Sequence, residues 1–575
     1  MMYLQADVYV WNLSEAKRRL DAGQVMIGDA CKIHRLKQHL GEVKDLAFSS
    51  RNDYLCTLGG QDDNAIVVWH VESGEAVCGS PAASDSVQCV KWLHGRNDRL
   101  VTAGFYHVRV WQIDFRQPKL HVIEAKLGSL RRVYSCLDIT PDDSIAYCGT
   151  TTGDIVKVKI DRDEIRSYNE PDIIVPILVA VSKDRVARGV KCVSCVLNDV
   201  TGNTNVLVGA GDGTLAYINP QLNYVKSKQT QLMGGVTSIS QHCISGVFNV
   251  GTDQCNRYEV NAELTNATMK SSCHYGSVND VSFPNGCPDL IVSSSAGDIR
   301  VWNIRMKQEL LRIQVPNLEC LCTSVSPSGS SLVSGWDDGK IRSFFPETGR
   351  LKFVIPDAHS EKVTALAIVD NDARGPWRLI SGGSEGRVRI WNVTPTHQAM
   401  LSSLKEHRGP VNSLKITKDA KNFISASSDG SCIVWDIERC CRIMAFFEPT
   451  VFSSVLYHPD ESQMLTCGSN HKIAYWDATD GQAIRVLEGG EGSVTSLDIA
   501  PSGEFFISGC ADHLLKVWHY DEGLTVAVGK GHSGSIKAVK LSPDQKTIVS
   551  VGSTGEIIFW EMPPAEQLRR GLLVE

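Results

Sequence analysis

The sequence lacks the features of several large protein classes. Lys and Arg number 58 against 65 Asp and Glu, so the net charge is −7; nucleic-acid-binding proteins usually carry a basic excess, and we expect no nucleic-acid partner. The most apolar run, residues 173–181, is nine residues long and contains Pro176. It is too short to cross a bilayer, so no membrane association is expected. Residues 1–10 contain no basic segment followed by an apolar one, which argues against a signal peptide.

Signatures of catalysis and of metal or cofactor binding are also missing. The sequence contains no GxSxG, HExxH or Walker motif. The glycine-rich stretch 209–213 lies between two expected strands, which favours a hairpin turn over a phosphate loop. Cys192 and Cys195 form one CxxC, but no second pair follows at zinc-site spacing. The 19 Cys are spread along the chain, which favours reduced thiols in the cytoplasm over a disulfide framework. We expect no enzymatic activity, no cofactor and no metal.

Aromatic residues make up only 7% of the chain, yet Trp recurs at regular intervals. Nine Trp end short β-branched segments such as VRVW and IVVW: Trp11, Trp69, Trp111, Trp302, Trp391, Trp435, Trp476, Trp518 and Trp560. From Trp391 onward the steps are 44, 41, 42 and 42 residues. This is the period of WD40 repeats, in which each copy forms a four-stranded propeller blade. Four further copies without Trp lie near Val158, Tyr217, Tyr258 and Phe344, giving 13 in all.

The copy ending at Trp435 carries a polar set that fits a blade interior. His407, Ser425, Asp429 and Trp435 stand before the first strand, on the second, in the next turn and on the third. Buried together, an imidazole, a hydroxyl, a carboxylate and an indole N–H satisfy one another by hydrogen bonding. We interpret the set as structural. Other copies are expected to vary it, with Glu385 replacing Asp beside His359, and Thr554 standing in the Asp place beside His532.

Thirteen blades exceed one ring, because propellers close with typically four to eight. We predict an all-β fold of two tandem propellers. Residues 1–271 form an N-terminal ring of five full blades and a partial one, residues 272–565 form a seven-bladed ring, and residues 566–575 form a tail. Since Trp11 lies so close to Met1, two strands of the first blade are absent, and we expect the chain to be N-terminally truncated.

Several stretches outside the generic repeat point to one family. They include CGSPAA at 78–83, GTTTGDI at 149–155, WDDGKIR at 336–342, PETGRL at 346–351 and DHLLKVW at 512–518. Together they resemble the cilia- and flagella-associated protein 52 family of axonemal WD-repeat proteins. The resemblance covers residues 5–562 and implies two seven-bladed propellers, with the first blade and most of the second missing here.

The resemblance also implies a function. Members of the family are microtubule inner proteins, which bind α/β-tubulin in the B-tubule lumen of doublet microtubules near the inner junction, contact other inner proteins and stabilise the axoneme for motility. The location is the cytoplasm, in the cytoskeleton of the cilium or flagellum. Candidate contact loops are 336–340 and 346–350, with the following contact residues: Trp336, Asp337, Asp338, Lys340, Glu347 and Arg350.

Two alternatives belong to other functional classes. WD40 substrate receptors of cullin-type ubiquitin ligases often carry W-D-x-R after the third strand. Here Trp302 is followed by Asn303 and Arg305, and Trp435 by Asp436 and Glu438, so neither copy fits fully. A WD40 scaffold in trafficking or signalling is the other alternative.

Overall fold

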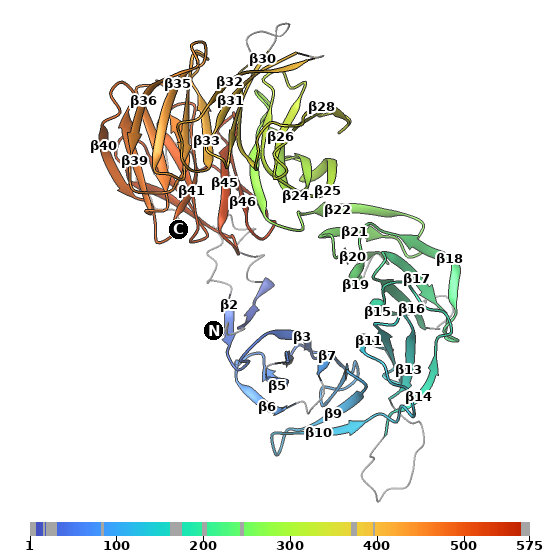
Figure 1. Ribbon diagram of the computed structural model, residues 1–575. Helices are drawn as coiled ribbons and strands as arrows, with labels where there is room; N and C mark the ends of the chain where they lie inside the picture. The colour runs from blue at the N-terminus through green and yellow to red at the C-terminus, as the bar shows by residue number, and fades with distance from the viewer. Residues whose placement is uncertain are drawn as a thin grey trace, which may run out of the picture. The chain divides into compact units, whose positions relative to one another are not determined.

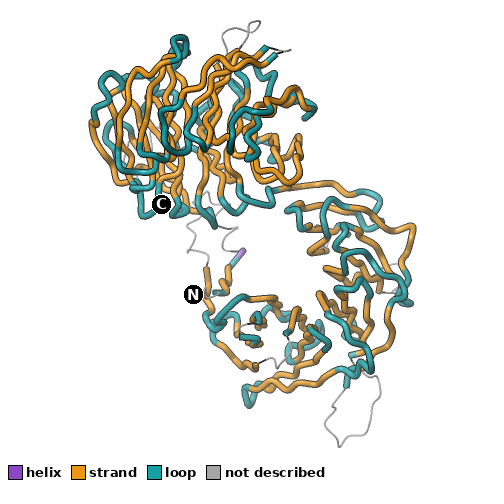
Figure 2. Tube along the Cα trace, in the orientation of Figure 1, coloured by secondary structure: helices purple, strands orange, loops and turns teal. Residues whose placement is uncertain are grey.

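The structure is a computed structural model that describes residues 7–14, 18, 32–61, 63–81, 86–160, 175–197, 204–241, 246–369, 377–394 and 397–564. The predicted tail, 566–575, lies outside these ranges. Strands make up nearly all of the regular structure, and they form short antiparallel meanders (Figure 2). The expected all-β fold of tandem β-propellers is confirmed. Within the described ranges, no helix is long and apolar enough to span a membrane.

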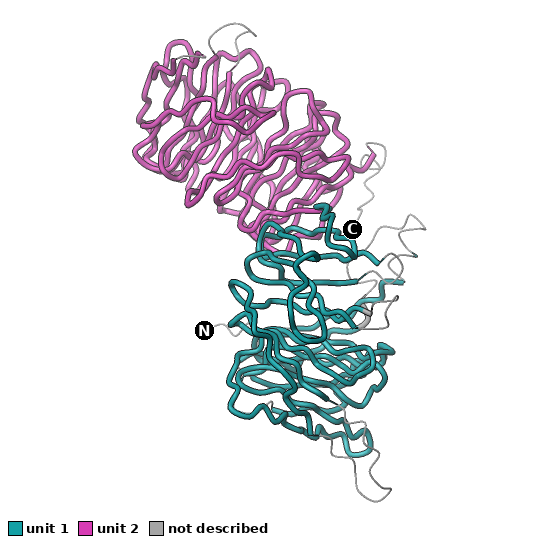
Figure 3. The backbone as a smooth tube through the Cα atoms, turned by 90° about the vertical axis from the view of Figure 1, so that its right-hand side faces the viewer, with its two compact units in different colours: residues 1–270 teal, residues 271–575 magenta. Residues whose placement is uncertain are grey.

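The chain divides into two compact units, residues Met1–Lys270 and Ser271–Glu575 (Figure 3). In unit 1, a two-stranded sheet is followed by five four-stranded meanders (Figure 1). Their strands are β1 (Val8–Trp11), β2 (Lys32–Leu36); β3 (Val43–Phe48), β4 (Tyr54–Gly59), β5 (Ala65–His70), β6 (Ala76–Pro81); β7 (Val87–Trp92), β8 (Arg99–Gly104), β9 (Val108–Asp114), β10 (Lys119–Glu124); β11 (Tyr134–Ile139), β12 (Ile145–Thr150), β13 (Ile155–Lys159), β14 (Ile177–Val181); β15 (Val190–Leu197), β16 (Thr204–Ala210), β17 (Thr214–Ile218), β18 (Tyr224–Gln231); β19 (Val236–Gln241), β20 (Phe248–Thr252), β21 (Asn256–Val260) and β22 (Ala267–Ser272).

Unit 2 begins with a six-stranded sheet, continues with four four-stranded meanders and ends with a three-stranded sheet. Their strands are β23 (Val278–Ser282), β24 (Leu290–Asn303), β25 (Gln308–Val325), β26 (Leu332–Trp336), β27 (Ile341–Phe344), β28 (Leu351–Ile355); β29 (Val363–Val369), β30 (Trp377–Gly383), β31 (Val388–Val393), β32 (Gln398–Leu404); β33 (Val411–Ile416), β34 (Asn422–Ser427), β35 (Ser431–Asp436), β36 (Cys441–Phe447); β37 (Phe452–Tyr457), β38 (Gln463–Gly468), β39 (Lys472–Asp477), β40 (Ala483–Glu488); β41 (Val494–Ile499), β42 (Phe505–Cys510), β43 (Leu514–His519), β44 (Thr525–Lys530); β45 (Ile536–Leu541), β46 (Thr547–Gly552) and β47 (Ile557–Glu561).

The six-stranded sheet results from two long strands. β24 is 14 residues long; its residues 292–295 pair with β23 and its residues 296–303 pair with β25. β25 is 18 residues long; its first part pairs with β24 and its last part, Cys320–Val325, pairs with β26. Two meanders that elsewhere would be joined by a loop are therefore joined by continuous backbone pairing.

Neighbouring sheets pack face to face, so the central strands of each meander are buried on both sides. On β34 and β35, Ile424 and Val434 pack against Met464 and Trp476 of the next sheet. The Phe446 ring stacks on Trp476 with centroids 4.4 Å apart. Burial on both faces explains why second strands such as NFISAS are almost continuously apolar or small instead of alternating. The outermost strands are solvated on their free edge, as Ile443 of β36 shows with 54% of its surface exposed.

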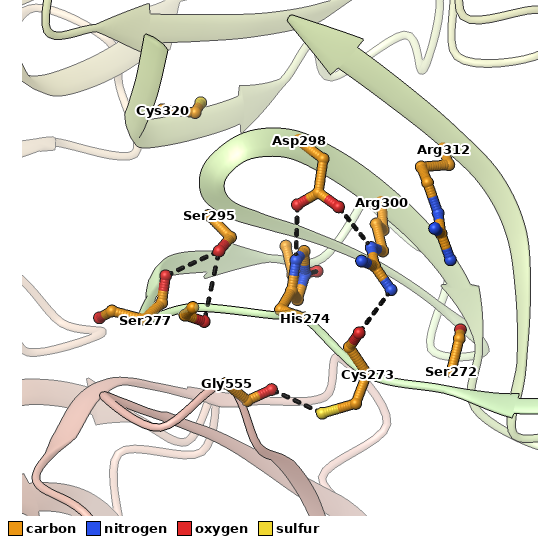
Figure 4. A network of polar contacts seen from close by, with 12 residues as sticks. Ser272, Cys273, His274, Ser277, Ser295, Asp298, Arg300, Arg312, Cys320 and Gly555 are labelled. Atoms are coloured by element: carbon orange, nitrogen blue, oxygen red, sulfur yellow. Dashed lines mark hydrogen bonds and ion pairs between the residues drawn. The ribbon is translucent and has the colours of Figure 1, made fainter. Parts of the chain in front are cut away.

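Unit 2 closes on itself. Val278 and Ile291 of the first sheet form one apolar cluster with Ala538 and Val549 of the last. The Cys273 thiol also donates to the Gly555 carbonyl, at 2.8 Å (Figure 4). A cavity of about 400 Å³ runs through the centre and is lined by residues from β23, β25, β29, β33, β37, β41 and β45. The inner strand of every meander therefore faces one axis.

In unit 1 the two-stranded sheet covers one side of the first meander. Val8, Val10 and Leu36 pack on Leu55 and Trp69 of β4 and β5. Trp11 of β1 is 48% exposed, although the Trp at the same repeat position in β5 is only 5% exposed.

Candidate functional site

The polar set predicted for the meander β33–β36 of unit 2 comes together in the structure. Ser425 accepts a hydrogen bond from the Trp435 indole at 2.8 Å, and its hydroxyl lies 2.7 Å from His407 Nε2. His407 Nδ1 contacts Ser431 Oγ at 2.7 Å, and Ser431 donates to Asp429 at 2.5 Å. Asp429 itself is 3.6 Å from Nδ1. Ser431, which the sequence analysis did not include, therefore connects the histidine to the carboxylate.

Two complete sets were missed from the sequence. In the first, His39 bridges Asp63 and Thr57, at 2.8 Å each, and Trp69 donates to Thr57 at 2.9 Å. The second set uses His274, Asp298, Ser293 and Trp302, joined by contacts of 2.7 to 2.8 Å.

Figure 4 shows that the second set continues outward through arginine. Arg300 donates to Asp298 at 2.7 Å and to the Cys273 carbonyl at 2.8 Å (Figure 4). Because Cys273 also reaches Gly555 in the last sheet, this network links the polar interior of the first meander to the ring closure.

Three histidines at this position of the repeat favour the neutral form. Burial lowers the pKa of His274, of His407 and of His359, the last to about 4, against the opposing effect of the neighbouring carboxylates. A neutral imidazole donates through one ring nitrogen and accepts through the other, which is what a chain from indole through hydroxyl and imidazole to carboxylate requires. The sets therefore act as structural ties between the loop before the first strand and the second and third strands.

The carboxylate that reaches His532 was not identified from the sequence. His532 Nδ1 contacts Glu556 Oε1 at 3.0 Å, and His532 Nε2 contacts Ser550 at 2.6 Å. Thr554, expected in the Asp position, is exposed and donates to Glu556 instead. For His359 the expectation agrees with the geometry, since Glu385 contacts its Nδ1 at 3.0 Å. Glu385 follows Ser381 by four residues, as Asp429 follows Ser425, whereas Glu556 follows Ser550 by six.

Trp336 is not a surface residue, and its assignment as a contact residue was wrong. Its side chain is 0% exposed, and its indole donates to Ser334 at 2.8 Å. Phe344, at the usual Trp position of β27, has no N–H to offer, so Trp336 supplies that donor from the second strand. The guanidinium carbon of Arg342 lies over the indole face, 5.2 Å from the ring centroid.

The space for this large side chain exists because this meander has no histidine before its inner strand. In the meanders of His359 and His532, the position equivalent to Trp336 is Gly383 or Gly552. A Cβ there would lie 2.3 Å from His359 Nδ1 or 2.9 Å from His532 Nδ1. Glycine makes room for the imidazole in those meanders, and Trp336 fills the same place here.

The other candidate contact residues differ in how accessible they are. Asp338 forms two hydrogen bonds with Arg342, at 2.7 and 3.0 Å, which lower its pKa despite the opposing effect of burial. Asp337 accepts from the Glu319 backbone N–H at 3.0 Å. Lys340 is 42% exposed and lies 4.0 Å from Asp338, whereas Glu347 and Arg350 are exposed.

The two candidate loops lie at opposite ends of β27. Residues 337–340 join β26 to β27, and residues 345–350 join β27 to β28. Successive turns of a meander fall on opposite faces of the sheet's ring, so one flat partner surface cannot take both loops. The exposed pair Glu347 and Arg350 therefore forms one candidate surface, and Lys340 belongs to the other face.

A second group of hydrogen bonds, which was not predicted from the sequence, joins neighbouring inner strands. A polar side chain at the second position of an inner strand donates to the first carbonyl of the next inner strand. Asn279 donates to Cys320 at 2.9 Å, and Thr364 donates to Val411 at 2.5 Å. The same contact is made by Asn412 to Phe452, Thr495 to Ile536 and, in unit 1, Ser135 to Val190. We call these contacts inner-strand ties.

The glycine-rich stretch and the CxxC motif of the sequence are parts of ordinary strands and turns in the structure. Residues 211–213 form the turn between β16 and β17, where Gly213 has φ of +92°. Cys192 and Cys195 are free thiols on β15 whose pKa is raised by burial. In the described part of the chain, no group of three or more His, Cys, Asp or Glu side chains could hold a metal ion.

Comparisons with known proteins agree with the repeat pattern. The family model described as "WD domain, G-beta repeat" matches residues 30–70, 350–392, 398–436, 481–519 and 523–561. Cilia- and flagella-associated protein 52 of Sus scrofa is 40% identical over 98% of this chain and 86% of its own length. The protein of that name from Chlamydomonas reinhardtii is 39% identical over 97% and 86%. WD repeat-containing protein 90 of Mus musculus is 21% identical over 83% of this chain and 27% of its own length.

Proposed function

Because the chain belongs to the cilia- and flagella-associated protein 52 family, we propose that it is a non-catalytic structural protein of motile cilia and flagella. It acts as a microtubule inner protein that binds α/β-tubulin of doublet microtubules in the B-tubule lumen, near the inner junction and beside other inner proteins. There it stabilises the axoneme for motility. The observation that carries this proposal is the similarity over almost the whole chain to relatives named for cilia and flagella.

The architecture of unit 2 supports a load-bearing role. Its ring is closed by an apolar cluster and the Cys273 contact, and its neighbouring inner strands are joined by ties. A body that is already ordered loses little conformational entropy on docking. The net charge of the whole chain, −7, disfavours attraction to acidic tubulin through overall charge. We propose that binding to tubulin rests on local, shape-matched contacts, with charged side chains such as Arg350 placed at the interface.

Fractionation of axonemes tests the proposal. The tagged chain is expressed in ciliated cells, membrane and matrix are removed with detergent, and the axonemes are extracted with salt. We expect the protein to stay with the extracted doublets. Its release with the membrane and matrix would contradict the proposal and favour a soluble scaffold, and co-purification with a cullin ligase would favour a substrate receptor.

A charge reversal on the exposed 346–350 loop tests the contact surface. Arg350→Glu is expected to lower retention on doublets, because every charged side chain of the loop would then be acidic, as tubulin is. Glu522→Lys, in an exposed turn of another meander, is the control and should leave retention unchanged. Equal retention of both variants and the wild type would exclude this loop from the interface.

A further inference from the structure

The last sheet of unit 2 has no outer strand in the described part of the chain. It consists of β45, β46 and β47, and within the described ranges β47 is paired on one edge only. Trp560 of β47 is partly exposed, whereas the Trp side chains at the same position of β35, β39 and β43 are at most 7% exposed. An unpaired edge presents backbone N–H and C=O groups that can pair with another strand. The edge of β47 is therefore a place where a strand can be added.

A cavity of about 80 Å³ adjoins this edge. Ile557 and Phe559 of β47 line it together with Trp302 of the first sheet. All three side chains belong to or pack on the apolar cluster that joins the first and last sheets. Both sheets therefore contribute apolar surface to a cavity that lies next to the unpaired edge.

The other meanders of unit 2 show which side chain fills the equivalent place. On β36, Arg442 lies opposite Trp435, and Phe446, four residues later, stacks on Trp476 of the next sheet. Four other outer strands have an apolar side chain at this register position, and each packs in the cluster that contains the next third-strand aromatic: Ile313, Ile355, Leu404 and Leu487.

Two aromatic residues of this series remain. On β44 the position is Gly529, whose backbone lies close to Trp560, since a Cβ there would be 3.0 Å from the ring. Among the described strands, none supplies an outer-strand side chain to Trp302, and the cavity lies where that side chain would be.

The tail, residues 566–575, follows β47 closely and is long enough for an outer strand. It reads EQLRRGLLVE. In most meanders of unit 2 the residue opposite the third-strand aromatic comes seven residues after it, but between β31 and β32 it comes nine residues after, and that connection contains Pro395. Pro563 and Pro564 favour the longer connection, because the residue before a proline avoids the helical conformation that tight turns use.

The longer connection fixes the register of the tail. Arg569 then lies opposite Trp560, and Leu573, four residues later, takes the position that Leu404 has on β32. In that register Leu573 lies opposite Ile557, which lines the cavity. The tail therefore places an apolar side chain where an apolar cavity adjoins the free edge.

We propose that residues 567–573 form the fourth strand of the last sheet, antiparallel to β47, with the side chain of Leu573 in the cavity beside Trp302. This strand pairs the backbone groups of the free edge and supplies the contact that outer strands make elsewhere in the ring. Because a short connection tethers the tail to β47, its local concentration at the edge is high, which favours it over a strand from a separate protein. The proposal concerns how unit 2 is completed and does not depend on tubulin binding.

Hydrogen exchange read by mass spectrometry tests the strand pairing. The full chain is compared with a variant that ends at Ala565. We expect the peptide 555–562, which covers β47, to exchange about tenfold or more slowly in the full chain, and the peptide 514–519, which covers β43, to exchange alike in both. Equal exchange of peptide 555–562 in the two proteins would overturn the proposal and would leave the edge of β47 to a strand from another protein.

Two leucines of the tail test the register. Leu573→Asn places a polar amide in the apolar cavity, so it should lower the melting temperature of unit 2 by several degrees and speed exchange of peptide 555–562. Leu568→Asn is the matched control, because Leu568 lies opposite the exposed Glu561 in this register, and it should leave both readings close to the wild type. A larger effect of Leu568→Asn than of Leu573→Asn would contradict the register.

Adding the tail back as a peptide keeps the test independent of folding defects. A synthetic peptide of residues 566–575 should restore slow exchange of peptide 555–562 in the shortened chain. The same peptide with Leu573→Asn should not restore it. Equal restoration by both peptides would overturn the assignment of the cavity to Leu573.

Discussion

Replacement of Trp336 by alanine separates a structural role from a contact role. The side chain is 0% exposed, so its truncation leaves a cavity. Replacing a buried Trp or Phe by Ala lowers the free energy of unfolding by about 3–5 kcal/mol. The hydrogen bond to Ser334 adds about 1 kcal/mol. The Arg342 guanidinium over the ring adds about another 1 kcal/mol. These contributions overlap, and we expect a total loss of about 4–6 kcal/mol.

Thermal unfolding measures this loss. For a unit of this size a change of 1 kcal/mol moves the melting temperature by about 2 °C, so the transition of unit 2 should fall by about 8–12 °C. Trp336→Phe keeps most of the volume and removes the N–H. Since Ser334 still donates to the Arg342 carbonyl at 3.1 Å, this variant should lose only about 1–2 kcal/mol.

Trp11→Ala is the control, because that Trp is 48% exposed and lies in unit 1. It should leave the unit 2 transition in place. A Trp336→Ala protein that melts within about 2 °C of the wild type would refute the structural assignment. Normal melting combined with weaker retention on doublets would return Trp336 to the contact surface.

Three further predictions concern the ties and networks. Thr364→Val should lower the free energy of unfolding by about 1 kcal/mol in urea, because one inner-strand tie is lost. A change of similar size in an exposed Thr, such as Thr348→Val, would contradict this. Glu556→Ala should destabilise by about 1–3 kcal/mol because it leaves buried His532 without its acceptor, whereas Thr554→Val should change stability by less; the reverse order would show that Thr554, and not Glu556, is the partner on which the set depends. The pKa of His359, about 4 against an ordinary 6.5, means that the unfolded state binds more protons between these values. Stability should therefore fall by about 3 kcal/mol as pH drops from 6.5 to 4, and His359→Gln should flatten this dependence; an unchanged profile would refute it.

The repeat could be predicted because one physical constraint recurs in it. The third strand of each meander needs a side chain that fills the space between sheets and donates to the second strand, and Trp does both. Trp391, Trp435, Trp476, Trp518 and Trp560 all donate to a Ser or Thr ten residues earlier. A fixed spacing along two paired strands is visible in the sequence.

The acidic member of each set could not be predicted in the same way. It follows the second-strand hydroxyl by four residues in Asp429, by five in Asp298 and by six in Asp63 and Glu556. The turn after the second strand places the acidic residue at varying positions along the backbone. The longer side chain of Glu556 reaches the histidine from a residue farther along that turn. A fixed spacing of four residues therefore finds Asp429 and Glu385 but misses Asp298, Asp63 and Glu556. A search for any acid four to six residues after the hydroxyl, with a His 18 to 22 residues before it, covers all five.

The candidate contact loops illustrate a different limit. The WDDGKIR and PETGRL stretches stand out from the generic repeat, which suggested a partner. The structure gives Trp336, Asp338 and Arg342 an internal reason for their presence, since they fill and cover the place of a missing histidine. Distinctive residues mark both interfaces and local exceptions to a packing rule, and burial is needed to distinguish them.

The long strand β25 restricts where the polypeptide of unit 2 can be cut or rearranged. The later meanders are joined by turns, at residues 405–410, 448–451, 489–493 and 531–535. New chain ends or inserted domains at such turns break no strand pairing, which is the condition under which circular permutants fold. Within residues 315–319, the same operation would divide a strand that is paired to β24 on one side of the cut and to β26 on the other. The first two meanders of unit 2 should therefore be expressed and engineered as a single piece.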